Sequence, residues 1–309
     1  MSPPSPRLLV LVGPTGSGKS AVAMTLAQQL TGEILSADSM QVYRGMEIGT
    51  AKPTREDRRA VPHHGLDLVE PQIPFTVAMY RRYALATLPA IQARGHWPIM
   101  VGGTGLYIRA VIDGLCPAPP EDAACRQALA AEAIQVGSAA LHDRLRAADP
   151  ATAAKLHPHD TRRIIRALEV YQVSGRPLSA WQTATTGLAP EWHVTQVGLS
   201  RPREELYERI ETRVRQMVSA RLIEEARALQ AAGLSRTAAQ ALGYKHLFAA
   251  FEGQWSVDEA IERLIQDTRR YAKRQLTWFR RDSRIHWLPL EPHEPSLRTA
   301  ARVRSLLDD

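Results

Sequence analysis

Cysteine is scarce in this sequence, whose 309 residues include only Cys116 and Cys125. The two form no C-x-x-C pair, and no Cys/His array has the spacing of a zinc site, which excludes a disulfide framework and a zinc module. The neighbouring His63 and His64 do not change this, because adjacent residues seldom share a face and no carboxylate stands at ligand spacing. We therefore expect a reduced, cytoplasmic protein.

Long apolar runs are missing as well. No segment approaches the roughly 20 apolar residues of a membrane span, so we expect no membrane partner. Residues 1–7, rich in Pro and Ser, lack the pattern of a signal peptide because the apolar stretch after them is too short. Internal repeats are also absent. With 44% hydrophobic and 23% charged residues, the composition is that of a globular protein with one large domain or two moderate ones.

A glycine-rich motif stands between an apolar run at residues 8–12 and a helix-forming run at 21–27. Its residues are Gly13, Pro14, Thr15, Gly16, Ser17, Gly18, Lys19 and Ser20. The spacing predicts a P-loop, whose glycines let successive backbone N–H groups point into one concavity at a helix N-terminus. Lys19 adds a positive charge, and the Ser20 hydroxyl can bind a phosphate-bound Mg²⁺. The motif occurs by chance in about one such sequence in a hundred, but it does not reveal which phosphate compound is bound.

The first hundred residues alternate between predicted strands and helices. Strands are expected at residues 8–12, 33–37 and 97–101, and helices at 19–30 and 77–94, the second with Thr76 as N-cap and Gly95 as stop. Such alternation predicts a parallel sheet with right-handed crossovers. The predicted fold class is α/β, with a P-loop NTPase-like parallel sheet flanked by helices.

This alternation breaks at the proline-rich residues 116–120. Residues 118–191 are rich in alanine and lack a β-branched run, with helices expected at 122–137, 138–148, 161–174 and 178–183. A strand is expected again at 192–199, so we predict an all-helical insertion domain, 118–191, within a core made of residues 1–117 and 192–309. The second part of the core is predicted to contain helices at 203–232, ended by Gly233, and at 257–281, capped by Ser256, before a strand and a helix within 285–309.

One acidic residue typical of nucleoside triphosphatases is missing. A conventional P-loop ATPase places an aspartate at the end of a neighbouring strand to complete the Mg²⁺ shell, but here residues 99–101 are followed by Gly102 and Gly103. Asp38 and Thr104 instead lie just beyond the carboxyl ends of two predicted strands, where open α/β sheets bind ligands. Two readings of Asp38 stay open: a turn or helix-capping residue, or a general base or metal ligand that faces the P-loop.

The formal net charge of +7 favours a polyanionic partner, and basic residues gather in two places. Three arginines lie within residues 162–166, on a predicted helix, and residues 269–284 contain seven basic residues and one acid. Such runs are also typical of solvated helix faces, and the spacing of Tyr271, Trp278 and Phe279 suits burial in a core. For the run at 269–284 we favour contact with a nucleic-acid backbone.

Five motifs follow one another in order along the chain. They are the P-loop at 13–20, Asp-Ser-Met-Gln-Val-Tyr at 38–43, Gly-Thr-Ala-Lys-Pro at 49–53, Val-Gly-Gly-Thr-Gly-Leu-Tyr at 101–107 and Lys-Arg-Gln-x-Thr-Trp-Phe-Arg at 273–280. With them the chain resembles the tRNA isopentenyltransferase family, in its bacterial tRNA dimethylallyltransferase form, over nearly its whole length. Ser20, where many relatives have Thr, keeps the hydroxyl, and the absence of a C-terminal Cys/His zinc module fits the bacterial form.

The resemblance implies an enzyme that transfers the dimethylallyl group of dimethylallyl diphosphate to N6 of adenosine 37, the adenosine 3′ of the tRNA anticodon. The P-loop, Arg213 and Mg²⁺ would bind the diphosphate, and Asp38 would act as general base. The missing second acid is then understandable, because the diphosphate leaves intact and no phosphoryl group is transferred.

The same resemblance implies a set of tRNA-contacting residues. They are Asp38, Ser39, Met40, Gln41, Thr104, Arg126, Arg162, Arg163, Ile164, Ile165, Arg166, Gln240, Ala241, Leu242, Gly243, Tyr244, Lys245, Lys273, Arg274, Gln275, Leu276, Thr277, Trp278, Phe279 and Arg280. The target base would leave the anticodon-loop stack to reach Asp38, and the helical insertion would clamp the stem-loop of the tRNA, its expected partner. We expect the enzyme to act as a monomer.

Three alternatives remain at the level of sequence. A small-molecule kinase would use the P-loop to bind ATP, and an adenylate isopentenyltransferase would prenylate free nucleotides, although such an acceptor would not need the insertion or the basic runs. An RNA-binding protein could carry the P-loop as a purely structural turn.

Overall fold

The computed structural model describes residues 6–182, 185, 187–188 and 190–307. Residues 1–5 of the expected tail and Thr183, the expected end of a helix, lie outside the described residues. The chain divides into two compact units, one formed by Asp113–Gly187 and the other by Met1–Ile112 together with Leu188–Asp309. The domain boundaries expected from the sequence, at 117/118 and 191/192, differ from these divisions by a few residues.

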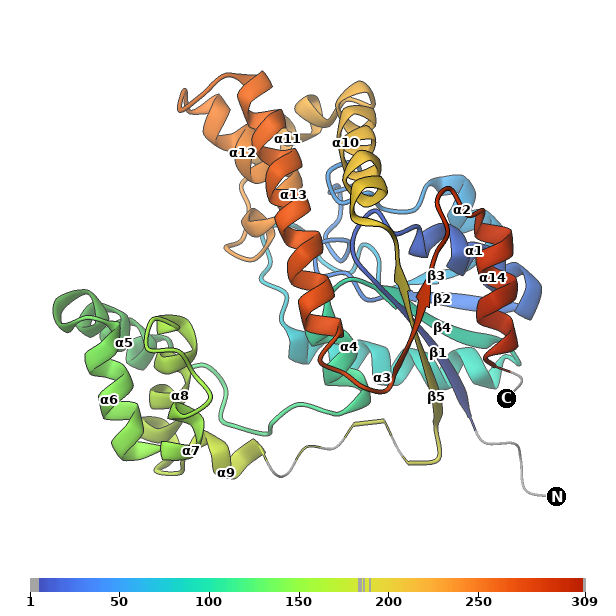
Figure 1. Ribbon diagram of the computed structural model, residues 1–309. Coiled ribbons are helices and arrows are strands. Elements are labelled where there is room, and N and C mark those ends of the chain that lie inside the picture. The colour runs from blue at the N-terminus through green and yellow to red at the C-terminus, as the bar shows by residue number, and fades with distance from the viewer. Residues whose placement is uncertain (1–5, 183–184, 186, 189, 308–309) are drawn as a thin grey trace. The chain divides into compact units, whose positions relative to one another are not determined.

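The larger unit is built on a sheet of six parallel strands in the order β3-β2-β4-β1-β5-β6 (Figure 1). The strands are β1 (Arg7–Val12), β2 (Gly32–Ser36), β3 (His63–His64), β4 (Trp97–Gly102), β5 (His193–Ser200) and β6 (Ile285–Pro289). The predicted α/β class with a parallel, P-loop-type sheet is confirmed. The short edge strand β3 was not expected, because two histidines carry neither apolar alternation nor a β-branched signal.

Both faces of this sheet are buried, and successive residues of β1 face opposite sides. Leu8, Val10 and Val12 belong to one hydrophobic cluster, and Leu9 and Leu11 to another. The helices of the unit are α1 (Lys19–Leu30), α2 (Arg55–Ala60), α3 (Val77–Ala93), α4 (Gly105–Ile112), α10 (Arg203–Ser219), α11 (Leu222–Ala232), α12 (Leu242–Phe251), α13 (Val257–Phe279) and α14 (Ser296–Ser305). Helices α1 and α14 cover the second cluster, whereas α3, α4 and α10 to α13 contribute to the first.

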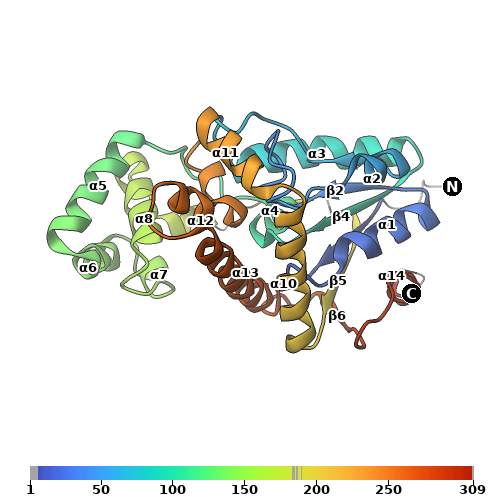
Figure 2. The ribbon, with the colours of Figure 1, turned by 90° about the horizontal axis from the view of Figure 1, so that it is seen from above.

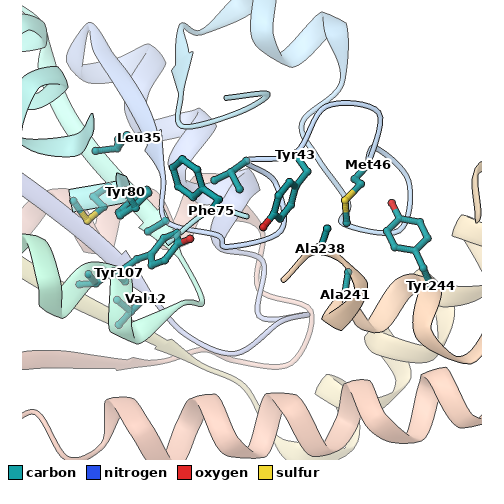
Figure 3. Packing of buried hydrophobic residues seen from close by; sticks show 14 of the residues in the cluster. Val12, Leu35, Tyr43, Met46, Phe75, Tyr80, Tyr107, Ala238, Ala241 and Tyr244 are labelled. Atoms are coloured by element: carbon teal, nitrogen blue, oxygen red, sulfur yellow. The ribbon is translucent and has the colours of Figure 1, made fainter. Parts of the chain in front are cut away.

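The first cluster extends from the sheet to the C-terminal helices (Figure 3). The rings of Tyr80 on α3 and Tyr107 on α4 stack with their centroids 4.0 Å apart. Further along, Tyr43 and Met46, in the loop after β2, lie on the side of Tyr244 on α12. This apolar packing fixes the loop after β2, which contains Asp38, between the sheet and the C-terminal helices.

Helix ends follow the sequence signals in two cases and not in a third. The Thr76 side chain caps α3, and Ser256 and Glu259 form a capping box at the start of α13, as expected. The single helix expected at 203–232 is wrong, because the chain breaks at Arg221, whose φ is 76°. The sequence around Arg221 contains no Gly or Pro that would predict this break. It allows Glu225 on α11 to reach a distant loop, and those tertiary contacts offset the cost of the left-handed residue.

The smaller unit is entirely helical among its described residues. Its helices are α5 (Ala123–Val136), α6 (Ser138–Ala148), α7 (Pro150–Ala153), α8 (Thr161–Ser174) and α9 (Leu178–Trp181). The unit has its own core, which includes Leu129, Leu141, Leu145 and Leu168. The helices expected from the sequence are present, and the short α7 is an addition. In the part of the chain that the structure describes, no helix is both long and apolar enough to cross a membrane.

Candidate active site at the phosphate loop

The glycine-rich motif forms a tight loop between β1 and α1, as predicted. Gly16 and Gly18 have φ values of 83° and 94°, a region that side-chain-bearing residues rarely adopt. Gly18 is also the N-cap of α1, so the positive end of the helix faces the loop. The Lys19 ammonium folds back and donates to the carbonyl of Pro14 at 2.9 Å. The loop therefore has the backbone shape and the cation of an anion-binding site.

Beside the loop lies a cavity of about 250 Å³ that combines polar and apolar walls. Thr15, Lys19 and Ser20 of the P-loop line it together with Asp38. Arg213 on α10 lines it as well, with Nη1 3.4 Å from the Thr15 hydroxyl. Helices α10 and α13, which pack against each other (Figures 1 and 2), each contribute to its walls. A carboxylate and two cations thus line one cavity.

Asp38 is both a turn residue and a lining residue of this cavity. Its Oδ1 accepts a hydrogen bond from the backbone N–H of Met40 at 2.8 Å, which closes a local turn. The next residue, Ser39, donates its backbone N–H to the Thr104 hydroxyl at 3.0 Å. Asp38 Oδ2 accepts no hydrogen bond from any residue that the structure describes. The turn therefore holds the carboxylate in place while one oxygen remains able to accept a proton.

Burial lowers the pKa of both cations that line the cavity. Burial of the ammonium and the nearby charge of Arg213 lower the pKa of Lys19 to about 7, against the opposing attraction of Asp38. Burial likewise lowers the pKa of Arg213, again against Asp38. A single carboxylate does not balance this pair, so an anion carrying several negative charges would stabilise both cations in their charged forms.

We expect the affinity for inorganic diphosphate to fall as the pH rises through about 7. Lysine is charged below its pKa, so Lys19 attracts the anion below this pH and progressively loses that attraction above it. The loss should reach about tenfold in affinity for each pH unit well above the pKa. Titration calorimetry with diphosphate at pH values below and above 7 measures this change in affinity. Lys19→Arg, whose guanidinium stays charged, is the control, and an identical pH dependence in both proteins would contradict the lowered pKa.

The loop at residues 47–53 forms one wall of the cavity. Three consecutive backbone N–H groups of this loop donate to the carboxylate of Glu225 at distances between 2.9 and 3.1 Å. The Tyr244 hydroxyl donates to the same carboxylate at 2.7 Å. At the other end of the loop, buried Lys52 forms an ion pair with Asp67 at 2.6 Å. The Gly-Thr-Ala-Lys-Pro motif thus owes its structure to groups far away in the sequence.

An apolar wall adjoins the charged part of the cavity. Ile210, Val214 and Met217 on α10 line it from one side, and Leu264 on α13 contributes from another. The three α10 residues lie four and three positions apart, which places them on one helix face. That spacing beside Arg213 is the sequence signal that could have identified them. The cavity can therefore bind a molecule with an anionic end and a small apolar group.

The family model for IPP transferase matches residues 41–282, and the model for isopentenyl transferase matches residues 6–62. The chain belongs to the IPP transferase family. A tRNA dimethylallyltransferase from Geobacter metallireducens is 49% identical over 284 residues, with 91% of this chain and 92% of that protein covered. One from Geobacillus kaustophilus is 50% identical over 286 residues, with coverages of 92% and 90%.

Solved structures of IPP transferase family members are similar as well. The full-length tRNA isopentenylpyrophosphate transferase from Bacillus halodurans has a TM-score of 0.70 and 39% identity, with 98% of this chain and 97% of that chain covered. A eukaryotic dimethylallyltransferase acting on tRNA has a TM-score of 0.81 and 25% identity, with coverages of 98% and 80%. The fold similarity thus spans nearly all of this chain.

Several of the expected tRNA-contacting residues of this IPP transferase family member lie at the cavity. Those that line it are Asp38, Ser39, Met40, Gln41, Gln240, Ala241, Leu242, Gly243 and Gln275. Thr104 contacts the turn of Asp38, as described above. Lys245 is exposed, whereas Tyr244 is fully buried against Glu225, so its side chain is not available to RNA.

The basic C-terminal helix α13 has an exposed and a buried side. Lys273, Arg274, Thr277, Trp278 and Arg280 are exposed, Leu276 is half-buried, and Gln275 and Phe279 are buried. The spacing of the three aromatic residues suggested burial, but only Phe279 is buried, whereas Tyr271 is half-buried and Trp278 is 37% exposed. Its indole Nε1 would lie 2.1 Å from a Cβ on Gly105, so the ring can pack in this position only because residue 105 has no side chain.

The arginines expected to contact tRNA from the helical unit fall into two groups. Arg162 and Arg163 are exposed on α8. Arg126 and Arg166 instead form ion pairs with the buried carboxylate of Glu169, at 2.7 and 2.9 Å. These ion pairs hold the two guanidinium groups in place. Ile164 and Ile165 are buried in the core of the unit, so their side chains are not available to RNA.

The donor set of the site suits Mg²⁺ better than a metal held by protein alone. Among the described residues, no group of three or more His, Cys, Asp or Glu side chains could hold a metal ion. The Ser20 hydroxyl, which lines the cavity, is a hard oxygen ligand of the kind that Mg²⁺ uses together with water and phosphate oxygens. The Nε2 of His64 contacts the buried carboxylate of Glu33.

Proposed function

We propose that this protein transfers the dimethylallyl group from dimethylallyl diphosphate to N6 of adenosine 37 in tRNA and releases diphosphate, acting as a monomer with Mg²⁺. The observation that carries the proposal is the single cavity in which Lys19, Arg213 and the Asp38 carboxylate meet beside an apolar wall. Its polar part suits the diphosphate, and its apolar part suits the five-carbon group. The relatives that are 49% and 50% identical to this chain are named tRNA dimethylallyltransferases, which supports tRNA as the acceptor.

The reaction exchanges one bond for another at the allylic carbon. The N6 lone pair attacks this carbon, the bond from carbon to the diphosphate oxygen breaks, and its electron pair leaves with the diphosphate. Asp38 accepts the proton that N6 loses, because an exocyclic amine is a weak nucleophile without a base. Lys19, Arg213 and the P-loop N–H groups stabilise the charge that develops on the leaving oxygen. The Ser20 hydroxyl would hold Mg²⁺, and the ion would supply further positive charge to the leaving group.

A P-loop kinase is the main competing enzyme class. Kinases transfer a phosphoryl group and use a second acidic metal ligand near the P-loop. Here β4 ends in Gly102, and the Gly103 carbonyl that follows is bound to Gln275 rather than accompanied by a carboxylate. Leaving-group binding without phosphoryl transfer needs no such ligand, which favours prenyl transfer.

A transfer assay tests this function. The protein is incubated with dimethylallyl diphosphate labelled in its carbon skeleton, Mg²⁺ and total bacterial tRNA, and the tRNA is digested to nucleosides. We expect the label in N6-dimethylallyladenosine. Parallel reactions with AMP as acceptor, and with γ-labelled ATP, should show no comparable product or phosphate release. Prenylation of AMP in place of tRNA, or ATP turnover with a small acceptor, would contradict the proposal.

Replacing Arg162 and Arg163 together by Ala should weaken tRNA binding without changing diphosphate binding. Both side chains are exposed on α8, so each can release counterions by binding a phosphate. The slope of log affinity against log salt should fall by about one for each phosphate that is no longer neutralised. Fluorescence anisotropy at several salt concentrations measures the slope. The control is Arg146→Ala, because Arg146 is an exposed arginine of the same unit that pairs with Asp143 as Arg163 pairs with Asp160. An unchanged slope in the double variant would remove both arginines from the RNA surface.

A further inference from the structure

The side-chain amide of Gln275 joins two loops that are far apart in the sequence. Its Nε2 donates to the carbonyl of Gly103 at 2.9 Å, and its Oε1 accepts the backbone N–H of Thr15 at 2.8 Å. The side chain is 6% exposed. Both halves of the amide are therefore satisfied inside the protein, one by the P-loop and one by the loop after β4.

The loop after β4 in turn supports Asp38. The Thr104 hydroxyl accepts the backbone N–H of Ser39 at 3.0 Å, and the Thr104 N–H donates to the carbonyl of Ala37 at 3.1 Å. These bonds fix the residues on both sides of Asp38. The P-loop is therefore connected to the turn that carries the carboxylate by the hydrogen bonds of Gln275, the peptide link from Gly103 to Thr104, and the hydrogen bonds of Thr104.

Gly102 and Gly103 lack a Cβ, and neighbouring groups occupy the space that a Cβ would need. A Cβ on Gly103 would lie 2.0 Å from the Gln275 amide nitrogen, and a Cβ on Gly102 would lie 2.1 Å from the carbonyl of Ala37. A side chain at position 102 would displace the backbone at Ala37, and a side chain at position 103 would displace the Gln275 amide from its hydrogen bonds. The two glycines that stand where an ATPase has its acid thus allow the close approach of α13 and of the loop after β2.

We infer that Gln275 is a positioning residue, which holds the P-loop and the Asp38 turn in one fixed relation. The inference rests on the proposed function, because that reaction needs the leaving oxygen, the allylic carbon, the attacking nitrogen and the base to be aligned at the same time. The leaving group is bound at the P-loop and the base stands on the other loop. A shift of about 1 Å between the two would slow transfer by up to about a hundredfold.

The substitution Gln275→Met removes both hydrogen bonds while keeping the length of the side chain. We expect the single-turnover rate at saturating concentrations of both substrates to fall by about tenfold to a hundredfold, with the dissociation constants of tRNA and of diphosphate changed less than about threefold. Gln266→Met, an exposed glutamine on the same helix, is the matched control and should keep the wild-type rate.

The outcomes separate this role from the alternatives. An unchanged saturated rate in a folded Gln275→Met protein, or a loss found only in the affinity for one substrate, would overturn the inference. If that variant does not fold, Gln275→Glu is judged in the same way, since it still accepts from Thr15 but cannot donate to Gly103 as a carboxylate. If neither folds, Gln275 serves the stability of the fold and the positioning role is refuted. Failure of the wild-type protein to prenylate tRNA would refute the proposed function instead.

Discussion

Asp38→Asn lowers the rate of dimethylallyl transfer by about two to four orders of magnitude, with near-normal affinity for tRNA. The amide can still accept the Met40 N–H and so preserve the turn, but it cannot take the proton from N6. The loss therefore measures the basicity of the carboxylate rather than the shape of the loop. Single-turnover kinetics with saturating tRNA, together with a tRNA-binding assay, give the two quantities.

The matched control for this variant is Asp258→Asn. Asp258 lies exposed in the first turn of α13, away from the cavity, and its loss should leave the transfer rate unchanged. Equal rates for Asp38→Asn and the wild-type protein would remove Asp38 as the base. A large loss of tRNA affinity at an unchanged saturated rate would make it a binding residue only.

Lys19→Met lowers kcat/KM for dimethylallyl diphosphate by about a hundredfold to a thousandfold. The methionine keeps the length of the side chain but leaves Arg213 as the remaining lining cation at the leaving oxygen. Because the effect arises where charge develops during bond breaking, kcat should fall along with the affinity for the diphosphate. Steady-state kinetics with dimethylallyl diphosphate varied at saturating tRNA measures both.

Lys155→Met provides the comparison, since Lys155 is an exposed lysine of the helical unit. It should leave the kinetics with dimethylallyl diphosphate unaltered. A Lys19→Met protein with normal kcat/KM would mean that the P-loop does not hold the leaving group, and that the cations of the cavity serve another anion.

The sequence was informative about the sheet and the P-loop for a local reason. Residues 8–12 are apolar at every position because β1 is buried on both faces. The motif at 13–20 needs glycines because the turn of the loop requires positive φ values, which is a local property of the backbone. The same holds for the caps at Thr76 and Ser256. Such features are encoded within a few residues, so they can be read without the rest of the chain.

Other features of the site depend on contacts between distant residues. The break at Arg221 has no local signal, and its benefit arises from Glu225 binding the loop at 47–53. Gln275 lies in a basic run whose composition predicts a solvated or RNA-binding face, yet its amide points inward to Thr15. Only the packing of α13 on the P-loop distinguishes it from the exposed Arg274, its neighbour in the chain.

The central claim is that the P-loop holds a diphosphate that departs intact while the carbon group is transferred past it. Dimethylallyl diphosphate labelled with ¹⁴C in the carbon skeleton and ³²P in the diphosphate tests this in one reaction with tRNA. The account predicts ¹⁴C in the tRNA and an equal molar amount of ³²P released as free diphosphate. Incorporation of ³²P into tRNA, or its release as single phosphate, would contradict it.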